Sequence, residues 1–276
     1  MKALLKMEFK RAFHSVSFYL SLMIGMLICG AEFFMEVIPN AVNVVDGYIP
    51  SAISAPFSVF ESWIGQGVCG SIYRNIYITM IPIISVMAYA GSYNRDRKYG
   101  YIKNIFTREK KYKYLIAKHL ASCVSGGIAV VFPLLCNLLV TMAVLPSLLP
   151  QPTIGNLTRG LGLWSDVFYT HPYQFIFRFF VLIFIFQSVY VGIALAISEF
   201  ADNSFLILLF PFLLGYFVHT LLCYINGPVR NWSPTYMVDM MEIRRLSLWQ
   251  IILEWLVVMI VTGVIYYLKG VRDETL

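Results

Sequence analysis

Six long apolar runs limit what this chain can fold into more than any other feature of its sequence. Each run is long enough to cross a bilayer as a helix, which takes about 20 residues. The strands of a membrane barrel are about half that length and alternate apolar with polar residues, a pattern that these runs lack. Because lipid-exposed backbone must hydrogen-bond to itself, we predict an all-α integral membrane protein with six transmembrane helices. The runs are Ser17–Met35, Ile72–Gly91, Leu120–Leu145, Gln174–Ile197, Ser204–Ile225 and Leu248–Leu268.

The overall composition agrees with this prediction. Hydrophobic residues make up 59% of the 276 residues, and only 13% are charged. The mean hydropathy is +0.71. A soluble protein of this length needs many more polar side chains to cover its surface. We therefore expect most of the surface to face lipid.

The basic residues are unevenly distributed along the chain. Nine of the 21 Lys and Arg residues lie in one segment, Asn94–His119 ("NRDRKYGYIKNIFTREKKYKYLIAKH"). Together with the amino-terminal segment and the tail, this makes fifteen on one side of the predicted spans and four on the other. The positive-inside rule then places both termini and this segment in the cytoplasm, next to anionic lipid headgroups. Without a soluble basic domain, the net charge of +6 does not indicate nucleic-acid binding.

Residues 1–16 predict an amphipathic interfacial helix ahead of a six-span transmembrane domain, 17–276. Its polar face carries lysines at every fourth position, and such a helix lies along the inner interface. A frayed basic tail is the alternative. A cleaved signal peptide is disfavoured because the first span continues without a small-x-small site before Glu32. The apolar face comprises Leu5, Phe9, Ala12, Phe13 and Val16, and the polar face Lys2, Lys6 and Lys10.

The spans are joined by a cytoplasmic loop, 94–118, and by three outer loops, 36–71, 146–173 and 226–247. In the first outer loop we expect "SAPFSVFESWIG" to rest on the membrane interface, where Phe57 and Trp63 are favourable. The five cysteines form no C-x-x-C pair, so we interpret them as small apolar fillers.

No motif of a known catalytic site occurs in the sequence. It lacks a phosphate-binding G-x-x-x-x-G-K-[ST], a G-x-G-x-x-G, an H-E-x-x-H and a G-x-S-x-G. The four histidines are scattered along the chain. We therefore predict a protein without enzymatic activity or a cofactor of its own.

The basic segment itself predicts a short amphipathic helix. In "GYIKNIF" the apolar residues Ile102, Ile105 and Phe106 stand at i, i+3 and i+4, and Lys103 and Arg108 decorate the remaining surface. A further helical run then leads through Tyr112, Leu115 and Ile116 into the third span, with Lys118 at the membrane boundary. The short helix could lie on lipid, insert its apolar face into a groove of a soluble partner, or serve only as a positive-inside anchor.

The order of these features resembles the permease subunits of type 2 ATP-binding-cassette (ABC) exporters. Those chains have an interfacial amino-terminal helix, six spans with both ends inside, and a basic loop after the second span. Here the corresponding loop has Gly100, then "IKNI", a basic turn at 108–113 and an aliphatic stretch ending at Lys118. The segment "SPTYMVDMM", Ser233–Met241, is similar to the stretch that such permeases carry before the sixth span.

This resemblance implies a coupling helix that docks on a separate cytoplasmic ATPase, which would bind ATP and Mg²⁺. It also implies a second permease copy or a related permease as partner, and a bacterial cell membrane as location. The cargo implied is lipophilic or peptide-like. The coupling residues are then Gly100, Ile102, Lys103, Asn104, Ile105, Phe106, Thr107 and Arg108.

Five charged or titratable residues fall within the predicted spans, all in the outer third. An isolated charge there costs a few kcal/mol, roughly, so a partner or a wet cavity is expected. We predict that Glu32 and Glu254 pair with Arg74 or Arg178; the alternative is that both arginines snorkel to the interface. The fifth residue is His219.

Two other classes of function are also compatible with the sequence. One is an ATPase-independent membrane protein, either a carrier or an immunity-type protein that sequesters an antimicrobial peptide. The other is an intramembrane enzyme, for which Glu254 with His219 is the candidate catalytic pair.

Overall fold

The computed structural model describes residues 1–45, 58–65, 71–107, 109–150, 162–225, 228–239 and 246–272. Within these ranges the chain is helical, without strands, and six of its helices are long and apolar enough to cross a membrane. The fold is thus that of an all-helical, multi-pass membrane protein. The six are α2 (Val16–Glu32) continued by α3 (Ile38–Val45), α5 (Ile72–Tyr89) continued by α6 (Ser92–Lys98), α8 (Lys111–Val144), α10 (Pro172–Phe186) continued by α11 (Ser188–Ile197), α12 (Ser204–Tyr224) and α14 (Leu248–Arg272).

Shorter elements lie between and before the spans. The amino-terminal helix α1 covers Lys2–Phe13, and α7 covers Tyr101–Phe106. The other short helices are α4 (Val59–Ser62), α9 (Ser165–Thr170), a 3-10 turn (Pro228–Trp232) and α13 (Pro234–Met237).

The first span is longer than predicted. The helix runs past Met35 through a π-helical turn, Phe33–Val37, and through α3 to Val45, so the predicted outer loop 36–71 begins in a helix. Pro39 in α3 has no backbone N–H to donate, and the wider π-helical turn directly before it accommodates the loss. The apolar run alone does not reveal this continuation, because Pro and Asn normally mark a helix end.

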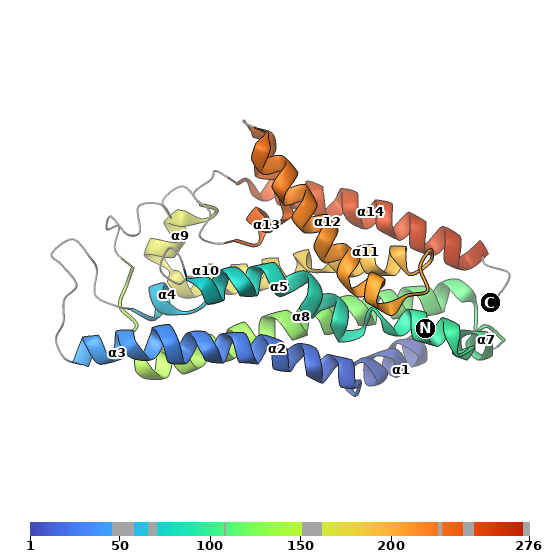
Figure 1. The fold of residues 1–276 in the computed structure, drawn as a ribbon, viewed down its shortest axis with the longest axis horizontal. Coiled ribbons are helices and arrows are strands. Elements are labelled where there is room, and N and C mark those ends of the chain that lie inside the picture. The colour runs from blue at the N-terminus through green and yellow to red at the C-terminus, as the bar shows by residue number, and fades with distance from the viewer. Residues whose placement is uncertain are drawn as a thin grey trace.

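The spans form an elongated bundle in which α2, α5 and α8 pack on one another (Figure 1). Helix α11 packs between α5, α8, α12 and α14, and α12 leans away from the bundle axis. The described ends of the chain, α1 and the last turn of α14, lie at the same end of the bundle. We call this end, which includes α1, α6, α7 and the first turns of α8, the basic end, and the opposite one the far end.

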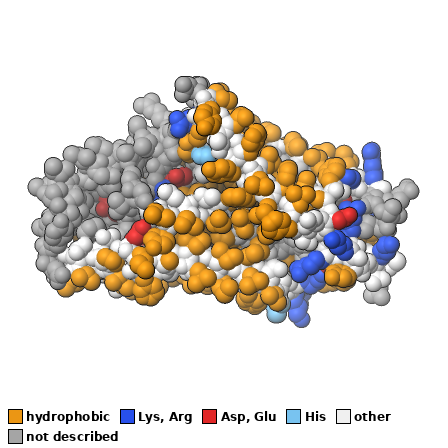
Figure 2. Space-filling view, in the orientation of Figure 1, with side chains coloured by type: hydrophobic (Ala, Val, Ile, Leu, Met, Phe, Trp, Pro, Cys, Tyr) orange, Lys and Arg blue, Asp and Glu red, His pale blue; other side chains and the backbone are white. Residues whose placement is uncertain are grey.

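The molecular surface agrees with this division. Figure 2 shows hydrophobic side chains covering the middle of the bundle, whereas Lys and Arg side chains gather at the basic end. At 34 residues, α8 is about 50 Å long and exceeds the roughly 30 Å hydrocarbon core of a bilayer. Its first turns therefore extend beyond the apolar belt and pack against α1.

The predicted interfacial position of Trp63 is wrong. Trp63 is fully buried, and its ring packs edge-on against Phe179 and Phe180 of α10. The backbone N–H of the next residue, Ile64, donates to Asn137 Oδ1 on α8 at 3.1 Å. This segment is thus inserted between helices at the far end, a placement that tertiary contacts decide. Phe57 lies outside the described residues.

Candidate functional site

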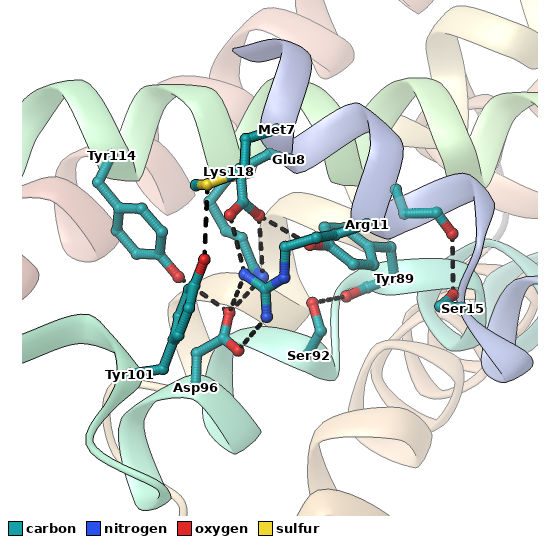
Figure 3. A network of polar contacts seen from close by, with 11 residues as sticks. Met7, Glu8, Arg11, Ser15, Tyr89, Ser92, Asp96, Tyr101, Tyr114 and Lys118 are labelled. Carbon is teal, nitrogen blue, oxygen red and sulfur yellow. Dashed lines mark hydrogen bonds and ion pairs between the residues drawn. The ribbon is translucent and has the colours of Figure 1, made fainter. Parts of the chain in front are cut away.

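Four charged side chains form a closed ring inside the basic end (Figure 3). Lys118 Nζ of α8 lies 2.7 Å from Asp96 Oδ2 of α6 and 3.2 Å from Glu8 Oε2 of α1. Arg11 Nη1 reaches Glu8 Oε1 at 2.9 Å and Asp96 Oδ2 at 3.1 Å, and Nη2 reaches Asp96 Oδ1 at 2.5 Å. Acids and bases alternate around the ring, so its net charge is zero. We call these four residues the ionic ring.

Tyrosine hydroxyls complete the hydrogen bonding of the two acids. Tyr89 donates to Glu8 Oε2 at 2.7 Å, and Tyr114 donates to Asp96 Oδ2 at 3.0 Å. The Tyr89 ring also faces the Lys118 ammonium, with 4.2 Å between Nζ and the ring centroid. Each carboxylate therefore has several donors, which a charge removed from water requires.

The ionic ring is largely shielded from solvent. Glu8 and Lys118 are fully buried and Asp96 nearly so, whereas Arg11 is partly exposed. Burial opposes the charge on Arg11, but the hydrogen bond to Asp96 and the surrounding negative groups prevail, so the pKa of Arg11 lies above its ordinary value. Removing any one member leaves an uncompensated charge in a largely buried site.

Sequence reasoning missed the ionic ring, although a signal was present. Glu8 is the only acidic residue among the first 31, and Asp96 and Glu109 are the only two in the basic segment Asn94–His119. A lone acid in a basic helix is a candidate for a buried partner. In α1 the buried positions are Leu4, Glu8 and Ala12, so the inward face includes this acid.

Helix α1 is present, but one residue of its predicted apolar face, Val16, is exposed and belongs to the next helix. It is helical as expected, although it ends at Phe13 rather than Val16, where the next helix has already begun. Its lysines Lys2, Lys6 and Lys10 are exposed. Leu5, Phe9 and Phe13 are half-buried and pack against the core while keeping part of their surface outward.

The short helix predicted in the basic segment is present as α7. It starts after Gly100, whose backbone is left-handed (φ 70°), a conformation that glycine adopts without strain. Ile102 is fully buried and Ile105 is 9% exposed, both packed against the chain's own core. Of the alternatives left open by the sequence, insertion of this apolar face into a groove of a partner is therefore wrong, because the bundle itself covers Ile102 and Ile105.

The outward surface of α7 is polar instead. Lys103, Asn104 and Thr107 are exposed, and Tyr99 just before the helix is 85% exposed. Arg108 lies outside the described residues.

Two aromatic contacts connect α7 to the ionic ring. The guanidinium of Arg11 lies over the Tyr101 ring, 4.2 Å from its centroid, and the Tyr101 hydroxyl donates to Met7 Sδ at 3.5 Å. Phe106 packs edge-on against Tyr114, which itself binds Asp96. A displacement of α7 therefore acts directly on ring members or on their immediate partners.

The predicted pairing of the intramembrane charges is also wrong. Glu32 is buried, and its Oε2 accepts a hydrogen bond from Asn137 Nδ2 at 2.7 Å, whereas Oε1 has no hydrogen-bond partner among the described residues. Arg74, in the first turn of α5, forms an ion pair with Asp239. Asp239 lies in the stretch after α13, so a loop residue outside the apolar runs provides the partner.

The remaining three candidates each have contacts of their own. Arg178 lies over Trp164, with 5.7 Å between the guanidinium carbon and the ring centroid. His219 Nδ1 lies 2.7 Å from Ser233 Oγ, and the ring packs against Tyr236. Glu254 Oε2 is buried without a hydrogen-bond partner in the described part of the chain. Glu254 and His219 are therefore not brought together as a catalytic pair.

No group of three His, Cys, Asp or Glu side chains that could hold a metal ion occurs among the described residues. Comparison with protein-family models, curated proteins and solved structures finds no match for this chain. The ionic ring is saturated with partners and offers neither a free nucleophile nor a free base. What its geometry can do is hold α1, α6, α7 and α8 together as one mechanical unit.

Proposed function

We propose that this chain is the membrane-spanning permease subunit of a type 2 ABC exporter. A separate cytoplasmic ATPase would bind ATP and Mg²⁺ and drive the transport. The sequence resemblance of the basic loop and of Ser233–Met241 supports this proposal. So do the six helices long enough to span a membrane and the short helix α7 after the second of them.

The observation that carries the proposal is the position of α7. This helix presents Lys103, Asn104 and Thr107 outward. Its inward face is held to the bundle by the buried Ile102 and by Tyr101, whose ring contacts Arg11 of the ionic ring. A helix that is polar outside and rigidly held inside is suited to pass a push from a docked protein to the spans. In this proposal the partner contacts the polar face rather than the apolar face.

The charge distribution gives the orientation, whereas the bacterial membrane, the second permease and the class of cargo are what the resemblance implies. The basic end faces the cytoplasm, with both termini, and α1 lies along anionic headgroups of a bacterial cell membrane. A second permease copy, or a related permease, completes the path for a lipophilic or peptide-like cargo.

A photo-cross-linking amino acid at position 104 tests the proposal in native membranes. We expect an adduct with a protein that contains a phosphate-binding loop, identified by mass spectrometry. Lys103→Glu should reduce its yield, because the charge on the docking face is reversed. The same probe at Leu149, exposed at the far end, is the control and should give no such adduct.

An ATPase-independent carrier or immunity-type protein gives the opposite result. Its probe at position 104 captures no nucleotide-binding protein, and its activity in vesicles persists when this chain is the only protein present. Either result would contradict the exporter proposal.

A further inference from the structure

Two cavities open along α14, and together they form one groove. The cavity toward the far end measures about 640 Å³ and lies between α10 and the first half of α14. The cavity toward the basic end measures about 430 Å³ and lies between α8, α10, α11 and the second half of α14. Ile185 and Trp255 line both cavities, so the two meet at this point. We call the combined space the α14 groove.

The α14 groove is as long as the hydrocarbon core of a membrane is thick. Its lining residues on α14 run from Leu248 to Tyr267, which corresponds to about 28 Å of helix. The hydrocarbon core of a bilayer is about 30 Å thick. An occupant that fills the groove is therefore about as long as the hydrocarbon core is thick.

The shape and lining of the groove suit a flexible apolar chain. Its walls are apolar along the whole length, so an extended alkyl chain can lie in it from one end to the other.

The lining of the groove is apolar, and one cationic side chain lies in the cavity toward the far end. Val181, Leu182 and Ile252 are typical of its walls, and among the residues that the structure describes Arg178 is the only charged one that lines either cavity. No acid pairs with Arg178 among the described residues; its guanidinium lies over Trp164 instead. The cation is thus left available to an anionic group of a ligand.

Trp164 occupies an unusual backbone conformation that serves this arrangement. Its φ of 59° is left-handed, a region that bulky side chains rarely adopt. It lines the same cavity as Arg178 and provides the ring surface on which the guanidinium rests. Strained backbone of this kind persists where the surrounding structure holds it, often at ligand sites.

We propose that the α14 groove binds the alkyl chain of a single-chain anionic amphiphile, with the acid group at Arg178. The alkyl chain extends from Arg178 past Trp255 into the cavity toward the basic end. There it approaches His119 and Tyr267, and the Tyr267 hydroxyl lies 3.1 Å from His119 Nδ1. As the binding site of the cargo, the groove rests on the proposed export function and narrows the cargo to lipid-like acids.

The binding test uses the purified full chain in nanodiscs of zwitterionic phosphatidylcholine. The probes are lysophosphatidic acid and lysophosphatidylcholine with the same chain, brominated at its middle, and the readout is quenching of tryptophan fluorescence. Trp164 and Trp255 line the groove, so a bound chain quenches them. We expect about tenfold tighter binding of the anionic probe, as a charge-assisted contact provides.

Arg178→Gln should abolish this preference, whereas the matched control Arg272→Gln should keep it. Arg272 is an exposed arginine at the last turn of α14, outside the groove. Equal affinity of the wild type for both probes, or an unchanged preference in Arg178→Gln, would overturn the proposal.

A second variant tests the binding of the alkyl chain rather than of the acid group. Gly263 lines the cavity toward the basic end, and a Cβ added there meets only the Tyr267 ring, at 3.8 Å or more. Gly263→Leu can therefore fold and fill the groove with its own side chain. We expect at least a fivefold loss of affinity for both probes with unchanged helicity. Unaltered quenching in this variant would contradict binding of the amphiphile in the groove. A disulfide between two copies of the Val181→Cys variant would also contradict it, because a second copy of the protein would then cover the groove.

The outcome is independent of the partner ATPase, because only this chain is present. If the amphiphile does not bind in the groove but the probe at position 104 cross-links to an ATPase, the exporter proposal stands and the cargo is a different one. If the amphiphile binds but no such cross-link forms, the binding site stands and the exporter proposal is contradicted.

Discussion

Lys118 shows how a single residue can be misjudged from sequence. A lysine at the start of an apolar run normally marks the membrane boundary and reaches toward water. Here the side chain is fully buried and points to acids on α1 and α6, 110 and 22 positions away in the sequence. Pattern reasoning sees the helix that carries Lys118 but not the helices that pack against it.

We predict that Lys118→Met destabilises the protein by about 3–5 kcal/mol, because Glu8 and Asp96 then remain buried with Arg11 as their one shared cation, which leaves a negative charge uncompensated. The free energy of unfolding in mixed micelles measures the effect. The matched control is Lys113→Met on the same helix, which breaks an exposed i, i+4 pair with Glu109 and should change stability little. Equal effects of the two substitutions would contradict a structural role of the ionic ring.

The two acids of the ionic ring could have been predicted from the sequence, but the geometry of the ring could not. Glu8 and Asp96 stand out as isolated acids in basic segments. That Tyr89 and Tyr114 provide their hydroxyl donors depends on the rotation of α5 and α8 about their axes. No periodicity in the sequence fixes that rotation between different helices.

Among the elements, the predicted helices are confirmed wherever an apolar run or a clear period defines them. The run through Tyr112, Leu115 and Ile116 correctly predicted that α8 begins before the third apolar stretch. The failures at this scale, which are the extension through α3, the buried segment around Trp63 and the buried face of α7, share one cause. Which face of a helix is covered, and whether a helix continues past a proline, is decided by neighbouring elements.

Close helix packing gives a prediction at this scale. A Cβ at Gly126 of α8 would lie 2.8 Å from the backbone oxygen of Ser85 on α5 and 2.9 Å from Gln187 Oε1. Gly126→Ala should therefore force α8 away from α5 and cost about 1–3 kcal/mol. The thermal midpoint in detergent is the readout.

The control is Gly30→Ala on α2, where an added Cβ meets nothing within 4 Å. It should stabilise the protein by about 0.5–1 kcal/mol, because alanine restricts the unfolded chain and favours the helix. If both substitutions lowered the midpoint equally, close approach at Gly126 would not be the cause.

A third prediction concerns the buried face of α7. Ile105→Asp should lower the yield of folded protein, because it places a carboxylate into the packed core. Lys103→Glu on the exposed face should leave folding intact and reduce only the cross-link that the probe at position 104 forms with the partner. Size-exclusion elution of the two variants separates the effects. A well-folded Ile105→Asp variant would mean that the apolar face of α7 is free after all.

At the scale of the whole molecule, the account depends on the two ends of the bundle facing opposite compartments. The apolar belt of Figure 2 sets the membrane position, and the ionic ring with α7 lies at the end where Lys and Arg gather. The number and order of the spans were predictable from composition and length. The tilt of α12 and the α14 groove were not, since both result from how the spans pack.

The most direct test of the central claim is the sidedness of two cysteines, Asn104→Cys in α7 and Leu149→Cys at the far end, on a background without native cysteines. A membrane-impermeant maleimide is applied to intact cells and to inverted vesicles. We predict that position 104 is labelled only in inverted vesicles and position 149 only in intact cells. Labelling of position 104 in intact cells, or of both positions from the same side, would contradict a cytoplasmic docking helix and the exporter built on it.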